Sequence, residues 1–114
     1  MITIYFHQSL NIYGDISALA NKPDLNYVYL AWCGNIYGDI SAFRNDINLN
    51  YFSILYNTTN ISGNISIFAN CTNLKSLHIS DNTSITGDVS SLRNLTDLRY
   101  LLVNKPGKVR IIQC

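Results

Sequence analysis

The sequence predicts an α/β solenoid, a right-handed coil in which each turn adds one short strand to a parallel β-sheet on the concave face. Two observations predict this fold. Four glycines recur at spacings of 24 or 25 residues, at Gly14, Gly38, Gly63 and Gly87. Between these glycines, each segment opens with three apolar residues at positions i, i+3 and i+5, as at Leu74, Leu77 and Ile79.

Length and composition are consistent with a single domain over residues 1–114. The chain is 47% hydrophobic and 13% charged, with a net charge of +1, which gives no electrostatic footprint for nucleic acid or an anionic membrane. No apolar run approaches the roughly 20 residues that cross a bilayer. We therefore expect no nucleic-acid and no membrane partner.

The repeat predicts about five strands, joined by short turns or 3-10 segments on the convex side. They fall near residues 1–9, 25–33, 49–57, 74–82 and 98–104. The tail, residues 105–114, departs from the pattern at Pro106, and we expect it to fold back as a strand that caps the stack. We expect the first strand to present an open edge, which favours pairing with another chain.

The turns carry their own pattern. Each of the four glycines suits a positive φ or a close approach between coils. A serine that follows each Ile or Val after the glycine is predicted to cap a short helical turn. The Asn that ends a strand, at Asn57 and Asn82, is predicted to turn inward and bond the backbone, with Ser9 and Cys33 in its place elsewhere.

These motifs resemble a known family. The motif L-x-x-L-x-L-x-x-[N/C], which resembles the leucine-rich repeat consensus, spans Leu25-Val28-Leu30-Cys33, Leu49-Phe52-Ile54-Asn57 and Leu74-Leu77-Ile79-Asn82. The connecting motif I-x-G-D-[I/V]-S-x-[L/F] is similar to bacterial, internalin-type 24-residue repeats, and its I-x-G-x-I element is also similar to the plant-specific class. The resemblance implies a solenoid used for protein interaction.

Aromatic residues dominate the positions predicted to point outward from the concave sheet. The predicted partner-binding residues are Tyr5, Tyr27, Tyr29, Trp32, Tyr51, Tyr56 and Tyr100. Leu55 and Leu102 are predicted to lie beside them, as are the smaller Ala31, Ser53 and Ser80. Tyr and Trp dominate binding hot spots, although aromatics also stabilise sheets by pairing across strands. We favour the binding interpretation.

No catalytic, metal or cofactor site is predicted. The column Asp15, Asp39 and Asp88 offers one carboxylate per coil, too few for calcium, and indicates turn hydrogen bonds instead. His7 and His78 lie three repeats apart without a shared carboxylate. The three cysteines form no C-x-x-C motif, which indicates reduced thiols.

The sequence therefore predicts a non-enzymatic protein-interaction module or assembly subunit. A bacterial or phage structural protein, such as a virion component, is one form of it. The expected partner is a protein or a second copy, bound through the concave face and the open N-terminal edge. The alternative is a carbohydrate-binding or adhesin module in which Trp32, Tyr29 and Tyr56 stack on sugar rings. The start, residues 1–10, lacks the basic and long apolar regions of a signal peptide, which predicts a cytoplasmic or virion-associated location.

Overall fold

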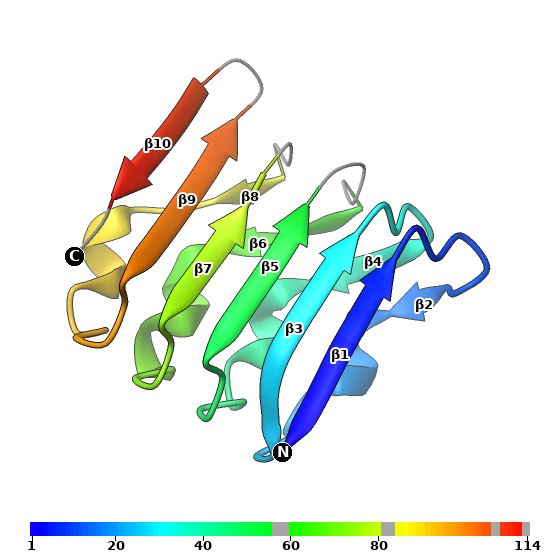
Figure 1. The fold of residues 1–114 in the computed structure, drawn as a ribbon, viewed down its shortest axis with the longest axis horizontal. Helices are drawn as coiled ribbons and strands as arrows, with labels where there is room; N and C mark the ends of the chain where they lie inside the picture. Colours follow the sequence, from blue (N-terminus) through cyan, green and yellow to red (C-terminus); the bar gives the residue numbers. More distant parts are fainter. Residues whose placement is uncertain (56–59, 81–83, 106–107, 113–114) are drawn as a thin grey trace.

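A six-stranded sheet forms one layer of the computed structural model. The structure describes residues 1–55, 60–80, 84–105 and 108–112, and the eight of these that follow Leu102 are described by their backbone alone. The strands of this sheet, in spatial order, are β1 (Ile2–His7), β3 (Leu25–Ala31), β5 (Tyr51–Leu55), β7 (Ser76–Ile79), β9 (Tyr100–Lys105) and β10 (Lys108–Ile112) (Figure 1). The first five run parallel, and β10 runs antiparallel to β9. A parallel sheet built from successive coils is the predicted solenoid.

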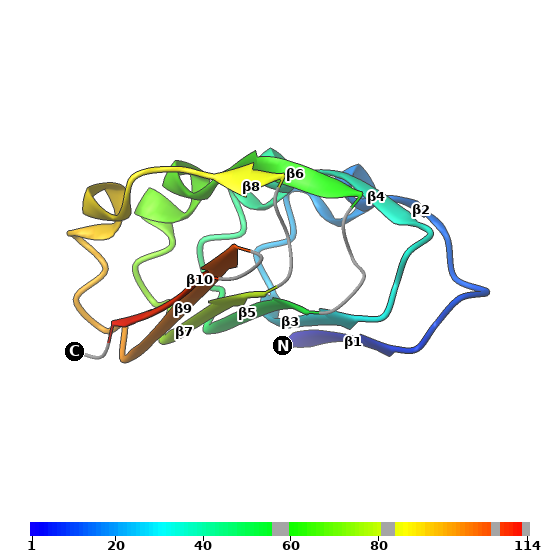
Figure 2. The same ribbon diagram turned by 90° about the horizontal axis from the view of Figure 1, so that it is seen from above.

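The opposite layer combines very short strands with 3-10 turns (Figure 2). The strands are β2 (Gly14–Asp15), β4 (Ile36–Asp39), β6 (Ile61–Asn64) and β8 (Ile85–Thr86), and they lie in that order. The turns are η1 (Ile16–Leu19), η2 (Ile40–Phe43), η3 (Ile65–Asn70) and η4 (Val89–Leu92). The 3-10 turns match the prediction for the convex side, whereas the sequence did not predict the second sheet.

The apolar core lies between the two layers and repeats from coil to coil. Each of the five parallel strands contributes inward residues, and each 3-10 turn contributes others from the far side. In the middle coils, the rings of Phe43 and Phe68 lie 4.9 and 4.7 Å from the ring of Phe52. All three are fully buried. Since one coil cannot bury its own apolar face, stacking supplies the stability of the fold.

The cap of each 3-10 turn is the acidic or amide residue two positions before the predicted serine. The Oδ1 atoms of Asp15, Asp39, Asn64 and Asp88 accept hydrogen bonds from the backbone N–H of the serine two residues later, at 2.8 to 2.9 Å. The prediction that the serine itself caps the turn was therefore wrong. The Asx oxygen accepts the otherwise unpaired N–H of the first turn, whereas the serine lies two residues inside the turn and supplies that N–H.

The repeated glycines combine both predicted properties. Gly63 has φ of 131°, and a Cβ built there would lie 2.6 Å from Cγ1 of Ile40 in the preceding coil. Gly38 and Gly87 are equally tight against their preceding coils. Glycine is required at these positions because the backbone needs a positive φ and the coils need to approach each other closely.

The inward turn at the strand end is visible at Cys33. Its thiol is buried and donates to the carbonyl oxygens of Ala31 at 3.3 Å and Phe6 at 3.5 Å. The equivalent residues Asn57 and Asn82 lie outside the described residues. A second inter-coil bond was not predicted: the Nδ2 of Asn60 donates to the carbonyl oxygen of Gly34 at 2.6 Å.

Candidate functional site

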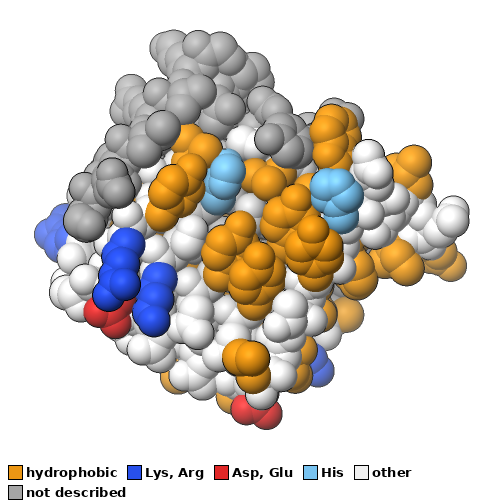
Figure 3. All heavy atoms as spheres, viewed as in Figure 1, with side chains coloured by type: hydrophobic (Ala, Val, Ile, Leu, Met, Phe, Trp, Pro, Cys, Tyr) orange, Lys and Arg blue, Asp and Glu red, His pale blue; other side chains and the backbone are white. Residues whose placement is uncertain are grey.

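The candidate site is the outer sheet face, which we define as the side chains of the six-stranded sheet that point away from the core. Parallel register lines these side chains up in rows across the strands. One row runs Thr3, Tyr27, Tyr51, Ser76 and Tyr100, and the next runs Tyr5, Tyr29, Ser53, His78 and Leu102. Figure 3 shows hydrophobic side chains, tyrosines included, gathered over β1, β3 and β5. The repeat therefore brings residues 24 or 25 positions apart into contact.

Four of the predicted tyrosines form two stacked pairs. The rings of Tyr5 and Tyr29 lie 4.5 Å apart with an angle of 9° between their planes. The rings of Tyr27 and Tyr51 lie 4.3 Å apart with an angle of 5°. Because each pair joins neighbouring strands, the rings stand on edge above the sheet. The cross-strand stabilisation considered from the sequence is therefore present at these four residues.

The remaining predicted residues lie around these pairs. Tyr100 is 38% exposed, and its ring meets that of His78 at 5.8 Å. Trp32 is 36% exposed just beyond the end of β3 and has φ of 58°. Gln8, one repeat earlier, has φ of 53°, so the positive φ at Trp32 belongs to the turn of the repeat. Tyr56 lies outside the described residues.

Several positions predicted to be open on this face are covered. Ala31 and Ser53 are fully buried, and Leu55 and Ser80 are each only 7% exposed. Ser53 lies between the larger side chains of Tyr29 and His78 in its row. Leu102 is half-buried. The larger side chains left accessible on this face are therefore mainly those of Tyr, Trp and His residues.

The site is electrostatically neutral at its centre. The Nδ1 of His7 lies 3.2 Å from the hydroxyl of Tyr29. Burial lowers the pKa of His78, which favours its uncharged imidazole. Burial, followed by the neighbouring Tyr51, raises the pKa of Tyr27. The face thus presents tyrosine hydroxyls and the uncharged imidazole of His78, with aromatic edges between them.

One buried carboxylate was missed by the sequence reasoning. Asp46 is fully buried in the loop before β5, and its Oδ1 accepts the backbone N–H of Lys22 at 2.7 Å. Its Oδ2 has no hydrogen-bond partner. The available signal was an Asp at a position occupied by Lys22, Cys71 or Leu95 in the other coils. Asp46 lies on the core side of the loop and is not part of the outer sheet face.

The acidic column has a structural role. Each of its carboxylates already accepts a turn hydrogen bond, which explains the column without a metal. Within the described part of the chain, no three His, Cys, Asp or Glu side chains gather into a metal-binding group. Among the same residues, no helix has both the length and the apolar character needed to span a membrane.

The chain was compared with known proteins. No protein-family model matches it, and no curated protein sequence matches it. Among solved structures, it is similar to the crystal structure of an internalin C2 from Listeria monocytogenes, with a TM-score of 0.50 and 28% sequence identity. The match covers 74% of this chain and 33% of that one, so this chain spans about a third of the internalin.

Repeat, fold and structural match define the class of protein. The chain folds as a leucine-rich repeat solenoid, similar to the internalin structure. Its coil, with one parallel strand on one side and a 3-10 turn on the other, resembles that of internalin C2. Leucine-rich repeat modules of this kind typically mediate protein interactions.

Proposed function

We propose that the outer sheet face is a protein-binding surface and that the chain is an interaction module or assembly subunit. The two stacked tyrosine pairs carry this proposal, since they form an aromatic surface on the side of the sheet turned away from the core. Tyrosine offers a large contact area and a hydroxyl at a small cost in side-chain entropy. The open edge of β1 offers a second surface for a protein partner.

Ring orientation favours a protein over a sugar. Each of the four stacked rings has one face covered by its neighbour, and the angle between the ring planes is 9° in one pair and 5° in the other. Ring edges and hydroxyls are therefore turned toward solvent. A sugar that stacks on an aromatic residue needs an uncovered ring face, whereas a protein surface makes use of edges and hydrogen-bonding groups.

A glycan-binding function is the second candidate, and Trp32 is the observation that favours it. Trp32 is 36% exposed at the rim of the outer sheet face. If it holds a sugar ring, Trp32→Ala abolishes a signal that the wild-type protein gives on a glycan array. The protein-binding proposal predicts no glycan signal for either protein.

The test of protein binding uses a double variant and a matched control. Partners captured by the wild-type chain are identified by mass spectrometry, and their affinities are then measured by calorimetry. Tyr27→Ala/Tyr51→Ala is expected to weaken binding at least tenfold, about 1.4 kcal/mol. Tyr37→Ala, 49% exposed on β4 in the other layer, is expected to bind normally. Equal affinities for the double variant and wild type would contradict the proposal, with circular dichroism as the check on folding.

We also infer that the chain is not an enzyme. Ser53 and His78 are neighbours on adjacent strands, but the Ser53 hydroxyl has no hydrogen-bond partner among the residues that the structure describes. A nucleophile and its base are recognised by that bond. A screen with serine- and cysteine-directed activity probes is expected to be negative. The virion role and the cytoplasmic or virion-associated location stay predictions, which fractionation of the source cells and particles tests.

A further inference from the structure

The N-terminal end of the solenoid is apolar and exposed. Six of the eleven exposed large hydrophobic side chains in the described part of the chain belong to its first thirteen residues: Met1, Ile2, Tyr5, Leu10, Ile12 and Tyr13. No Asp, Glu, Lys or Arg occurs between Met1 and Gly14. A concentrated apolar surface of this kind marks a contact site.

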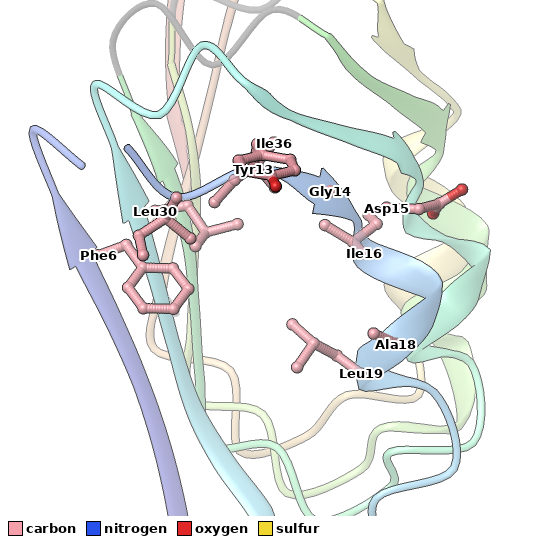
Figure 4. Close-up of a pocket in the computed structure, with 10 residues that line it drawn as sticks. Phe6, Tyr13, Gly14, Asp15, Ile16, Ala18, Leu19, Leu30 and Ile36 are labelled. Carbon is pink, nitrogen blue, oxygen red and sulfur yellow. The ribbon is translucent and has the colours of Figure 1, made fainter. Parts of the chain in front are cut away.

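A cavity opens into the core at this end. It has a volume of about 230 Å³ and lies between β1 and η1, as Figure 4 shows. Its apolar lining includes Phe6, Ile12, Ile16, Leu19, Leu30 and Ile36. The cavity is the inside of the first coil seen end-on, and an apolar side chain from a partner would fill it.

Gly14 distinguishes this end from the interior coils. At Gly38, Gly63 and Gly87, an added Cβ would lie within 2.6 Å of an atom of the preceding coil. At Gly14, no atom of the described residues lies within 4 Å of that position. The first coil therefore presents the packing surface of an interior coil.

The strand edge has hydrogen-bonding groups available for pairing. The N–H of Ile2 donates to Asp24 at 2.6 Å, and the N–H of Gln8 donates to Ala31 at 2.9 Å. Since backbone groups alternate in direction along a strand, the N–H groups of Thr3, Tyr5 and His7 point away from β3. β1 is the terminal strand of the sheet, and it lacks the charges and prolines that usually protect an edge.

We propose that this end pairs with the same end of a second copy, with β1 antiparallel to β1 about a twofold axis perpendicular to the sheet. The opposite edge is taken by the antiparallel β10, which excludes head-to-tail continuation of the parallel sheet. An antiparallel strand already extends this sheet at β9, so its twist accommodates one. No Asp, Glu, Lys or Arg side chain before Asp15 opposes the contact. A twofold contact also closes on itself as a dimer.

The proposed dimer also joins the two outer sheet faces on one side. A twofold axis perpendicular to the sheet keeps each face on its own side of the combined sheet. Odd-numbered residues of one β1 strand therefore lie opposite odd-numbered residues of the other. The dimer does not depend on what the outer sheet face binds. Tyr27→Ala/Tyr51→Ala tests partner binding and leaves the N-terminal end unchanged. The variants described next change the N-terminal end and leave these tyrosines unchanged.

The experiment measures molar mass by sedimentation equilibrium at protein concentrations from about 1 to 500 μM. This range brackets a dimer dissociation constant in the micromolar range. The wild-type protein is expected to form a dimer. Ile12→Lys, at a side chain 45% exposed, is expected to raise the dissociation constant at least tenfold. Ile47→Lys, 49% exposed in the loop between η2 and β5, is the matched control and is expected to dimerise normally.

Two further measurements keep the proposal testable if Ile12→Lys misfolds. Leu10→Lys, at a side chain 64% exposed, is expected to give the same monomer. Hydrogen exchange is expected to show protection of the Thr3, Tyr5 and His7 amides that rises with concentration. A wild-type monomer throughout the range, a dimer that survives both lysine substitutions, or species that grow beyond a dimer would overturn the proposal.

Discussion

Asp46 shows how a single residue sets the pH dependence of stability. Burial raises the pKa of this carboxyl, and the N–H and charge of Lys22 oppose the shift. A raised pKa means that the folded protein holds the proton more tightly than the unfolded chain does. The contribution of Asp46 to folding stability is therefore greatest below its ordinary pKa and is lost as pH rises through the raised value.

Replacing Asp46 is expected to remove this slope. Urea unfolding of wild type and Asp46→Asn is measured between about pH 3.5 and 7, which brackets the ordinary pKa of Asp near 3.9. The stability of the wild type relative to the variant is expected to fall as pH rises from the low end. Asp24→Asn, at an exposed side chain, serves as control. A constant difference between wild type and Asp46→Asn would contradict the assignment.

Asn60 carries an inter-coil bond although its side chain is exposed. The 2.6 Å bond from its Nδ2 to the carbonyl oxygen of Gly34 joins neighbouring coils. Asn60→Ala is expected to lower the free energy of unfolding by about 1 kcal/mol. Asn11→Ala, where the side chain makes no hydrogen bond within the described residues, is expected to change it by less than about 0.5 kcal/mol.

The repeat register predicts an inward position for Asn82, and with it a larger loss of stability than at Asn60. Asn82→Ala is expected to cost about 1–3 kcal/mol, because it orphans buried backbone groups. Asn82 itself lies outside the described residues. Equal unfolding midpoints for the Asn60 and Asn82 variants would place both residues in the same structural class and contradict the repeat register.

At the scale of the element, each 3-10 turn depends on its Asx cap. The Oδ1 of Asp39 accepts the N–H of Ser41 at 2.8 Å, and Asn64 makes the same bond one coil later at 2.9 Å. Asp39→Ala is expected to lower stability by about 1 kcal/mol, whereas Asp39→Asn is expected to be nearly neutral. Guanidinium unfolding of the two variants compares them, and equal losses would show that the cap bond contributes nothing.

At Asp88, the equivalent cap bond lowers the pKa of the carboxyl group. The N–H and hydroxyl of Ser90 lower the pKa of this carboxyl. Its contribution to stability is therefore present above the ordinary pKa and is lost as pH falls through the lowered value. The dependence is opposite in sign to that of Asp46. A pH profile of the whole protein sums both effects, so the single variants are needed to separate them.

Element types were more predictable from the sequence than the exact caps and exposures. The 24- or 25-residue spacing placed strands and turns correctly because register follows directly from periodicity. The cap was assigned to serine instead of Asx, since both residues recur in every coil and periodicity ranks neither. The burial of Ser53 and Leu55 was missed because alternation along a strand gives the side of the sheet on which a residue lies, and not how far its neighbours cover it.

At the scale of the whole molecule, the middle coils are expected to hold the stability. Phe52 packs between two other buried rings, whereas Phe6 in the terminal strand β1 is only partly buried. Phe52→Ala is expected to cost about 3–5 kcal/mol, and Phe6→Ala distinctly less. Urea unfolding measures both. Similar losses would contradict a solenoid whose stability is concentrated at its centre.

The candidate site was predictable as a surface but not in its detailed arrangement. Outward alternation along the strands placed Tyr5, Tyr27, Tyr29 and Tyr51 on one face. That the four would stack in pairs depends on rotamers, which a repeat pattern does not specify. The strand β10 was expected only as a tail that folds back, and its place within the sheet follows from pairing with β9.

The stacked tyrosines give the protein an optical signal of its own. Rings 4.3 and 4.5 Å apart, with planes nearly parallel, hold their electronic transitions close enough to couple. Such coupling adds a component to the circular dichroism of the aromatic region, and a tyrosine without a stacked neighbour lacks this component. A ligand that separates either pair would change this signal, so the surface proposed to bind a partner can report on binding without an added label.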